Sequence, residues 1–206
     1  MDHIDDVALT AQTMILGSGE LLPGRLHVDS PDACWWLARS LSACLGRLPE
    51  GQPPALAIVC IGTDRSTGDS LGPIVGSKLR EWRFLEKYAA VLGTLDDPVH
   101  AGNLGETIGL LEHRQRDGCH ILAVDACLGK LGSVGYITFA DGPLRPGTGV
   151  NKDLPHIGTA HITGVVNVGG FMEYLVLQNT RLSLVMRMAD AIARGIIAYI
   201  SDSLVR

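Results

Sequence analysis

Two aspartates in separate loops of this 206-residue chain could act together on one substrate. Asp69 lies in the polar loop that follows the apolar run 55–61. Asp125 directly follows a second apolar run, 119–124. Because like charges at short range raise one pKa, two neighbouring carboxyls can share a single proton. The charged member of such a pair can activate a water, and the neutral member can protonate a leaving group.

Other roles are open to the same residues. With a histidine, the two carboxylates could instead hold a divalent metal. Asp69 alone could cap the helix that follows it, and Asp125 alone could bond to loop amides at the end of its strand. Asp64 and Arg65 could form a solvated ion pair in the first loop. The occurrence of an aspartate at each of two strand ends favours one shared site.

Strands that alternate with helices are expected to position the pair. The apolar runs 55–61, 89–94 and 119–124 predict parallel strands that are buried on both faces. Two more strands are expected near 136–140 and 161–166, and helices are expected at 30–46, 69–82, from 103 onwards and at 180–203. This alternation predicts α/β architecture, a single three-layer α/β/α domain with a mostly parallel sheet. Ligands of such sheets bind beyond the carboxyl ends of the strands, where both aspartates are expected.

The chain divides into two parts by periodicity. Residues 1–29 have no clear period and are expected to form an irregular N-terminal arm. Residues 30–206 are expected to form the single α/β domain, because they contain neither an internal repeat nor a linker.

Composition excludes several classes of protein. The net charge is −5 and no run of Lys or Arg occurs, so no nucleic-acid partner is expected. The five cysteines form no C-x-x-C pair, which argues against a disulfide scaffold or zinc ribbon and for a reducing compartment. No uncharged apolar run approaches the roughly 18 residues of a membrane span, and the N-terminus is acidic where a signal peptide would be basic. We therefore expect a cytoplasmic protein with no membrane partner.

Motifs for nucleotides, nucleophiles and preformed metal sites are absent from the sequence. The loop after residue 61 has neither G-x-G-x-x-G nor G-K-[ST], and no G-x-S-x-G occurs. No two histidines have H-x-x-x-H spacing. We therefore expect no cofactor and no resident metal. His100, His156 and His161 lie in expected loops or at a strand edge, from which each could reach the crevice between the aspartates.

Five strings occur in order along the chain: CIGTDRSTGDSLGP, DPVHAGNL, AVDACLG, PGTGVNK and GFMEYLVLQNTRLSLVMRMA. Together they resemble the YyaC family, which is described as spore proteases of spore-forming Firmicutes. The resemblance covers roughly residues 55–200. That family is similar to the germination protease, which degrades small acid-soluble spore proteins. The resemblance therefore implies a peptidase with a protein or peptide substrate.

The strings also imply roles for single residues. Asp69-Ser70-Leu71-Gly72-Pro73 is similar to the D-A-L-G-P turn of the germination protease, and Asp125-Ala126 to its second aspartate string. The two aspartates are catalytic in that enzyme. Residues 146–152 resemble its P-G-S-G-V-G-N-K loop. We predict substrate contacts from this loop and the loop before Asp69, by Thr63, Asp64, Arg65, Gly147, Gly149, Asn151 and Lys152.

Hydrogenase maturation endopeptidases are similar in expected architecture. They place acidic residues at the positions of Asp69 and Asp125 and a histidine later in the chain, and this trio reads the nickel of their substrate. Here Asp69 stands where Glu is usual. By position, His161 is the first candidate for the histidine and His100 the second. This chain is also much shorter than the germination protease and lacks insertions that would shape its substrate groove or tetramer.

These observations predict a sporulation-associated endopeptidase, in the forespore or mother cell, that cleaves a protein such as a small acid-soluble spore protein. Two alternatives stay open. One is a non-catalytic sporulation protein that keeps the fold as a binding module and recognises its partner through residues 141–158. The other is a metal-dependent peptidase. Zymogen processing and the oligomeric state, including a homo-oligomer, are open as well.

Overall fold

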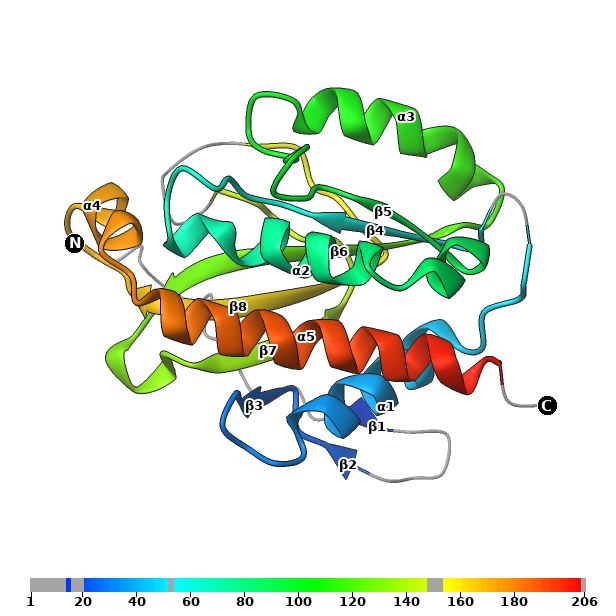
Figure 1. The fold of residues 1–206 in the computed structure, drawn as a ribbon, viewed down its shortest axis with the longest axis horizontal. Helices are drawn as coiled ribbons and strands as arrows, with labels where there is room; N and C mark the ends of the chain where they lie inside the picture. The colour runs from blue at the N-terminus through cyan, green and yellow to red at the C-terminus, as the bar shows by residue number, and fades with distance from the viewer. Residues whose placement is uncertain (1–13, 16–20, 52–53, 148–153, 205–206) are drawn as a thin grey trace.

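A six-stranded mixed sheet lies at the centre of the fold (Figure 1). The computed structural model describes residues 14–15, 21–51, 54–147 and 154–204. The strand order is β3-β7-β8-β6-β4-β5. These strands are β3 (Arg25–His27), β4 (Leu56–Cys60), β5 (Ala89–Leu92), β6 (His120–Gly129), β7 (Tyr136–Asp141) and β8 (Ala160–Val168). A separate antiparallel pair is formed by β1 (Met14–Ile15) and β2 (Leu21–Leu22).

The middle of the sheet is parallel. Strands β5, β4, β6 and β8 run in one direction, whereas β7 is antiparallel to both β8 and β3. All five residues of β4 are buried, as expected for an apolar strand with a parallel neighbour on each side. The strands predicted from the apolar runs are therefore present in the predicted places.

Five α-helices and three short 3-10 helices are described. They are α1 (Ala33–Leu45), α2 (Leu71–Arg80), α3 (Leu104–Arg116), α4 (Glu173–Gln178), α5 (Leu182–Asp202), η1 (Gly68–Ser70), η2 (Arg83–Lys87) and η3 (Leu131–Ser133). Among the residues that the structure describes, no helix is both long enough and apolar enough to span a membrane.

Two apolar clusters on opposite faces of the sheet form the core. Leu56 and Ile58 of β4 pack with buried residues of α1, α2 and α5. Ala57 and Val59, which alternate with them, pack with Leu104 and Leu111 of α3. Because alternate strand residues point to opposite faces, the helices form one layer on each side of the sheet (Figure 1). The predicted three-layer α/β/α class with a mostly parallel sheet is confirmed.

One expectation and one alternative about local structure are wrong. Arg25–His27 lies in the segment expected to be irregular, but it pairs with β7 as the edge strand β3. Three residues are too few to produce a visible period, so the pairing comes from the neighbouring strand. Asp69 is not the cap of the next helix, because a 3-10 turn precedes α2 and Ser70 is the N-cap residue. The division of the chain at residue 29 stays a prediction.

Candidate active site

The loops that carry Asp69 and Asp125 come from neighbouring strands. Strands β4 and β6 are parallel and end their pairing at Cys60 and Val124. The amide of Ile61 then donates to the Val124 carbonyl at 2.7 Å, which keeps the start of the first loop beside Asp125. The two strands that precede the aspartates are therefore adjacent, as a shared site requires.

Asp125 lies inside a strand and not after one, which corrects the predicted position. Strand β6 continues to Gly129 because it pairs with β8, where Thr163 is the partner of Asp125. The other neighbour of β6 is β4, which has already ended at Cys60. Asp125 is therefore held by a strand on one side and faces the loop of Asp69 on the other.

Close backbone contacts hold the Asp69 loop against the end of β4. The amide of Thr63 donates to the Asp69 carbonyl at 3.1 Å. Gly62 has a φ of +142°, and a Cβ on it would lie 1.9 Å from the same carbonyl oxygen. A Cβ on Gly68 would lie 2.6 Å from the Leu177 side chain of α4. Glycine is needed at both positions for the turn to place Asp69 where it is.

The electrostatics of Asp125 connect it with Asp69. Burial raises the pKa of the Asp125 carboxyl to about 8, and the negative charge of Asp69 contributes to the rise. The amide of Ala126, which donates to the carboxyl at 2.8 Å, opposes it. Asp125 therefore keeps its proton at neutral pH, while the charge beside it belongs to Asp69.

Cys127 and Thr163 are neighbours of Asp125 that were not predicted from the sequence. Burial, and Asp125 once its carboxyl is ionised, raise the pKa of the Cys127 thiol to about 12, against a hydrogen bond with Thr163. The thiol is therefore protonated and is a poor nucleophile. Strand alternation could have indicated Cys127, which follows Asp125 by two residues. Thr163 could not have been found, because its place depends on the register between β6 and β8.

The pKa of Asp125 predicts how stability depends on pH. A carboxyl whose pKa is higher in the folded than in the unfolded state contributes its full stabilisation at pH values below the unfolded-state pKa. This stabilisation is lost as the pH rises through the folded-state pKa. The variant Asp125→Asn is neutral at every pH. Since one pKa unit corresponds to about 1.4 kcal/mol, its free energy of unfolding should exceed that of the wild type by about 2 kcal/mol or more at pH 9.

Urea unfolding between about pH 4 and pH 9 measures this difference, which should widen between pH 4 and pH 8 and then stay constant. Asp117→Asn, at an exposed residue after α3, is the matched control and should show no widening. A constant gap for Asp125→Asn across this range would contradict the raised pKa.

The predicted substrate residues lie partly in the described structure. Thr63 accepts hydrogen bonds from the amide and the Nε of Arg65, both at 3.3 Å, and its hydroxyl lies 3.5 Å from Asp64 Oδ1. Asp64 and Arg65 are exposed beside the loop of Asp69. Gly147 is described and has a φ of +76°. The other three lie outside the described residues: Gly149, Asn151 and Lys152. Substrate contact by all seven stays a prediction.

Neither candidate histidine completes a metal site with the pair. His161 lies on the same face of the sheet as Asp125, and its Nδ1 is 2.9 Å from the Gly142 carbonyl oxygen. His100 accepts the Gly102 amide on its Nδ1 at 3.1 Å. In the described ranges, no three His, Cys, Asp or Glu side chains are grouped so that they could hold a metal ion.

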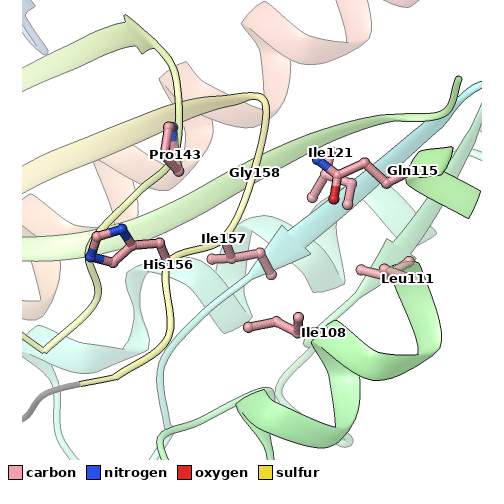
Figure 2. Close-up of a pocket in the computed structure, with 8 residues that line it drawn as sticks. All are labelled: Ile108, Leu111, Gln115, Ile121, Pro143, His156, Ile157 and Gly158. Atoms are coloured by element: carbon pink, nitrogen blue, oxygen red, sulfur yellow. The ribbon is translucent and has the colours of Figure 1, made fainter. Parts of the chain in front are cut away.

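A cavity of about 350 Å³ opens on the same side of the sheet, next to α3 (Figure 2). Its lining is formed mainly by apolar side chains, with a glutamine and a histidine among them: Ile108, Leu111, Gln115, Ile121, Pro143, His156, Ile157 and Gly158. Ile121 precedes Asp125 by four residues on β6, an even number, so both side chains point to this face. The sequence did not indicate this cavity, because four separate segments enclose it.

Comparison with known proteins places the chain in a family. A model of proteins of unknown function (DUF1256) matches residues 25–195. "Uncharacterized protein YyaC" of Bacillus subtilis (strain 168) is 55% identical over 170 residues, which are 82% of this chain and 80% of that protein. A crystal structure of the NiFe hydrogenase maturation protease HycI from Thermococcus kodakarensis KOD1 is 16% identical, with a TM-score of 0.44, and the match covers 71% of this chain and 92% of that one. The extent of the first two matches shows that the chain belongs to the YyaC (DUF1256) family.

Proposed function

We propose that this protein is a sporulation-associated endopeptidase that hydrolyses a protein substrate with the Asp69/Asp125 pair. The family match and the resemblance of the aspartate strings to those of the germination protease support this assignment. The substrate class that we propose is the small acid-soluble spore proteins, and the compartment is the cytoplasm of the forespore or mother cell.

One observation carries the chemistry: Asp125 has a pKa of about 8 beside the charge of Asp69. Two carboxyls with separated proton affinities can take opposite roles in hydrolysis. In the proposed reaction, the Asp69 carboxylate removes a proton from water as the water oxygen attacks the peptide carbonyl carbon. Protonated Asp125 then gives its proton to the leaving nitrogen as the C–N bond breaks. The pair ends with its proton on Asp69 and returns to the starting state by exchange with solvent.

The surroundings of the pair suit a polypeptide. Asp64 and Arg65 are exposed in the loop that leads to Asp69, and with Thr63 and the 146–152 loop they are the proposed substrate contacts. The cavity beside α3 is large enough for a side chain of the substrate (Figure 2). Its wall at Ile121 lies roughly 13 Å along β6 from Asp125, at about 3.3 Å per strand residue.

Incubation of the purified protein with small acid-soluble spore proteins tests the proposal, with cleavage followed by mass spectrometry. We expect discrete cuts by the wild type and by Asp117→Asn, and none by Asp69→Asn or Asp125→Asn. A chelator should leave cleavage unchanged. Unaltered cleavage by both aspartate variants would refute the mechanism. Binding of the substrate without any cleavage would show that the protein is a non-catalytic binding module. Loss of cleavage on addition of a chelator would show that it is a metal-dependent peptidase.

A further inference from the structure

A row of four side chains crosses the sheet from its edge to Asp125. The register pairs Arg25 of β3 with Thr138 of β7, Thr138 with Thr163 of β8, and Thr163 with Asp125 of β6. Paired residues on adjacent strands point to the same face, so the four side chains form a continuous row. The proposed catalytic carboxyl is one end of this row, and a guanidinium is the other.

The face that carries the row has more polar side chains on β7 and β8 than on the strands beneath α3. The cluster beneath α3 includes residues of β4 and of the first half of β6, but none of the described residues of β7 or β8. On those two strands the same face carries Thr138, Thr163, Tyr136 and His161, together with Ala140 and the buried Val165. Polar side chains on a sheet face beside a proposed active site suit a polar ligand.

The hydroxyl of Thr138 is an unusual member of this row. Thr138 is only 8% exposed, and among the described residues its Oγ1 has no hydrogen-bond partner. A buried hydroxyl without a partner costs stability, and native proteins contain few of them. Other buried threonines of the fold do have partners: the Thr107 hydroxyl donates to the Asn103 carbonyl at 3.1 Å. A ligand that accepts a hydrogen bond from Thr138 would account for the exception.

Arg25, the register partner of Thr138 on β3, adds a cation to the row. Its guanidinium lies 4.8 Å from the centre of the Tyr136 ring, and its Nη1 donates to the Ser133 hydroxyl at 3.4 Å. Both contacts orient the guanidinium without neutralising it, and within the described part of the chain Arg25 forms no salt bridge with an acidic side chain. The half-buried Arg25 and its register partner Thr138 thus offer a charged and a neutral hydrogen-bond donor on neighbouring strands, which suits a carboxylate.

We propose that Arg25 and Thr138 bind an acidic side chain of an extended polypeptide substrate. Adjacent strands lie about 4.8 Å apart, so Thr138 is roughly 10 Å and Arg25 roughly 14 Å from Asp125 across the sheet. An extended chain advances about 3.3 Å per residue, which places the acidic residue about three to four positions from the cleaved bond. The inference rests on the proposed function for the position of that bond, but binding itself does not require cleavage.

Fluorescence anisotropy with labelled decapeptide pools of mixed sequence measures the binding. One set of pools fixes Glu at a chosen position and the matched set fixes Gln, and the protein is the full chain with Asp125→Asn, which prevents turnover. We expect Glu pools to bind about three- to fivefold more tightly, the range of one partly exposed ion pair. Adding Arg25→Gln should remove the preference. Adding Arg187→Gln, at an exposed arginine of α5, should preserve it.

The two variants of buried threonines separate binding from folding. Thr138→Val should reduce the preference for Glu and leave Tm unchanged or higher, because the deleted hydroxyl has no partner. Thr107→Val should lower Tm and leave the preference unchanged. Equal binding of Glu and Gln pools, a preference that survives Arg25→Gln, or a fall in Tm for Thr138→Val like that of Thr107→Val would overturn the proposal. Displacement of all pools by inorganic phosphate, without a preference for Glu, would overturn it as well. Failure of the wild type to cut spore proteins would refute only the proposed function.

Discussion

Replacement of Asp125 by Asn is expected to lower kcat about 10²- to 10⁴-fold, the usual contribution of a general acid or base. The reason is that Asn cannot release a proton to the leaving nitrogen, although it matches the shape and neutrality of the protonated carboxyl. Asp69→Asn should have an effect of similar size, because it removes the base. Steady-state cleavage of a labelled spore protein measures both, with Asp117→Asn as the control variant.

The pH profile of the wild type makes the same prediction sharper. Since burial and the charge of Asp69 raise the pKa of Asp125 to about 8, the acid should be lost above that pH. The rate should then fall about tenfold per pH unit. A rate that stays constant from about pH 7 to pH 10 would show that the proton of Asp125 takes no part, even if Asp125→Asn is inactive.

Gly76→Ala is expected to destabilise the fold by about 3 kcal/mol or more. Gly76 lies in α2, and a Cβ on it would be 1.9 Å from the carbonyl oxygen of Gly93, which follows β5. Gly93 has no room to move away, because it is packed against the end of β4. A Cβ added to Gly93 would lie 1.9 Å from the carbonyl oxygen of Cys60. Both obstacles are backbone atoms, so the helix itself would have to move away from the sheet.

Urea unfolding of Gly76→Ala against a second helical glycine checks this expectation. Gly109 of α3 has no atom within 4 Å of an added Cβ. Gly109→Ala should therefore stabilise the protein by about 0.5–1 kcal/mol, since alanine favours the helix. If the two variants had similar stability, the close approach of α2 to the end of β5 would be wrong.

The sequence predicted those parts of the fold that local pattern determines. Strand β4 is apolar at every position. This pattern is expected of a strand that is buried on both faces, so the burial of β4 was predictable. The alternation of strands and helices predicted the layers for the same reason. Strand β3 could not be predicted, because Arg25–His27 becomes a strand only through pairing with a segment more than 100 residues away.

The candidate site shows the same division between local and distant information. The two aspartates were found because each follows an apolar run. Their electrostatic connection depends on β4 ending at Cys60 while β6 continues to Gly129, a difference in strand length that only the pairing with β8 produces. The isolated hydroxyl of Thr138 depends on register across three strands. No local sequence pattern contains that register.

The two aspartates sit on elements of unequal rigidity. Asp125 belongs to a ten-residue strand paired with β8, whereas Asp69 belongs to a three-residue 3-10 turn joined to its own loop by the Thr63 amide. Amide exchange should be slow in the strand and faster in the turn. Fluctuations in the separation of the two carboxyls would therefore arise mainly from the turn. Each excursion of Asp69 away from Asp125 would remove part of the field that raises the pKa of Asp125, so the proton affinity of the pair would follow the motion of a single loop.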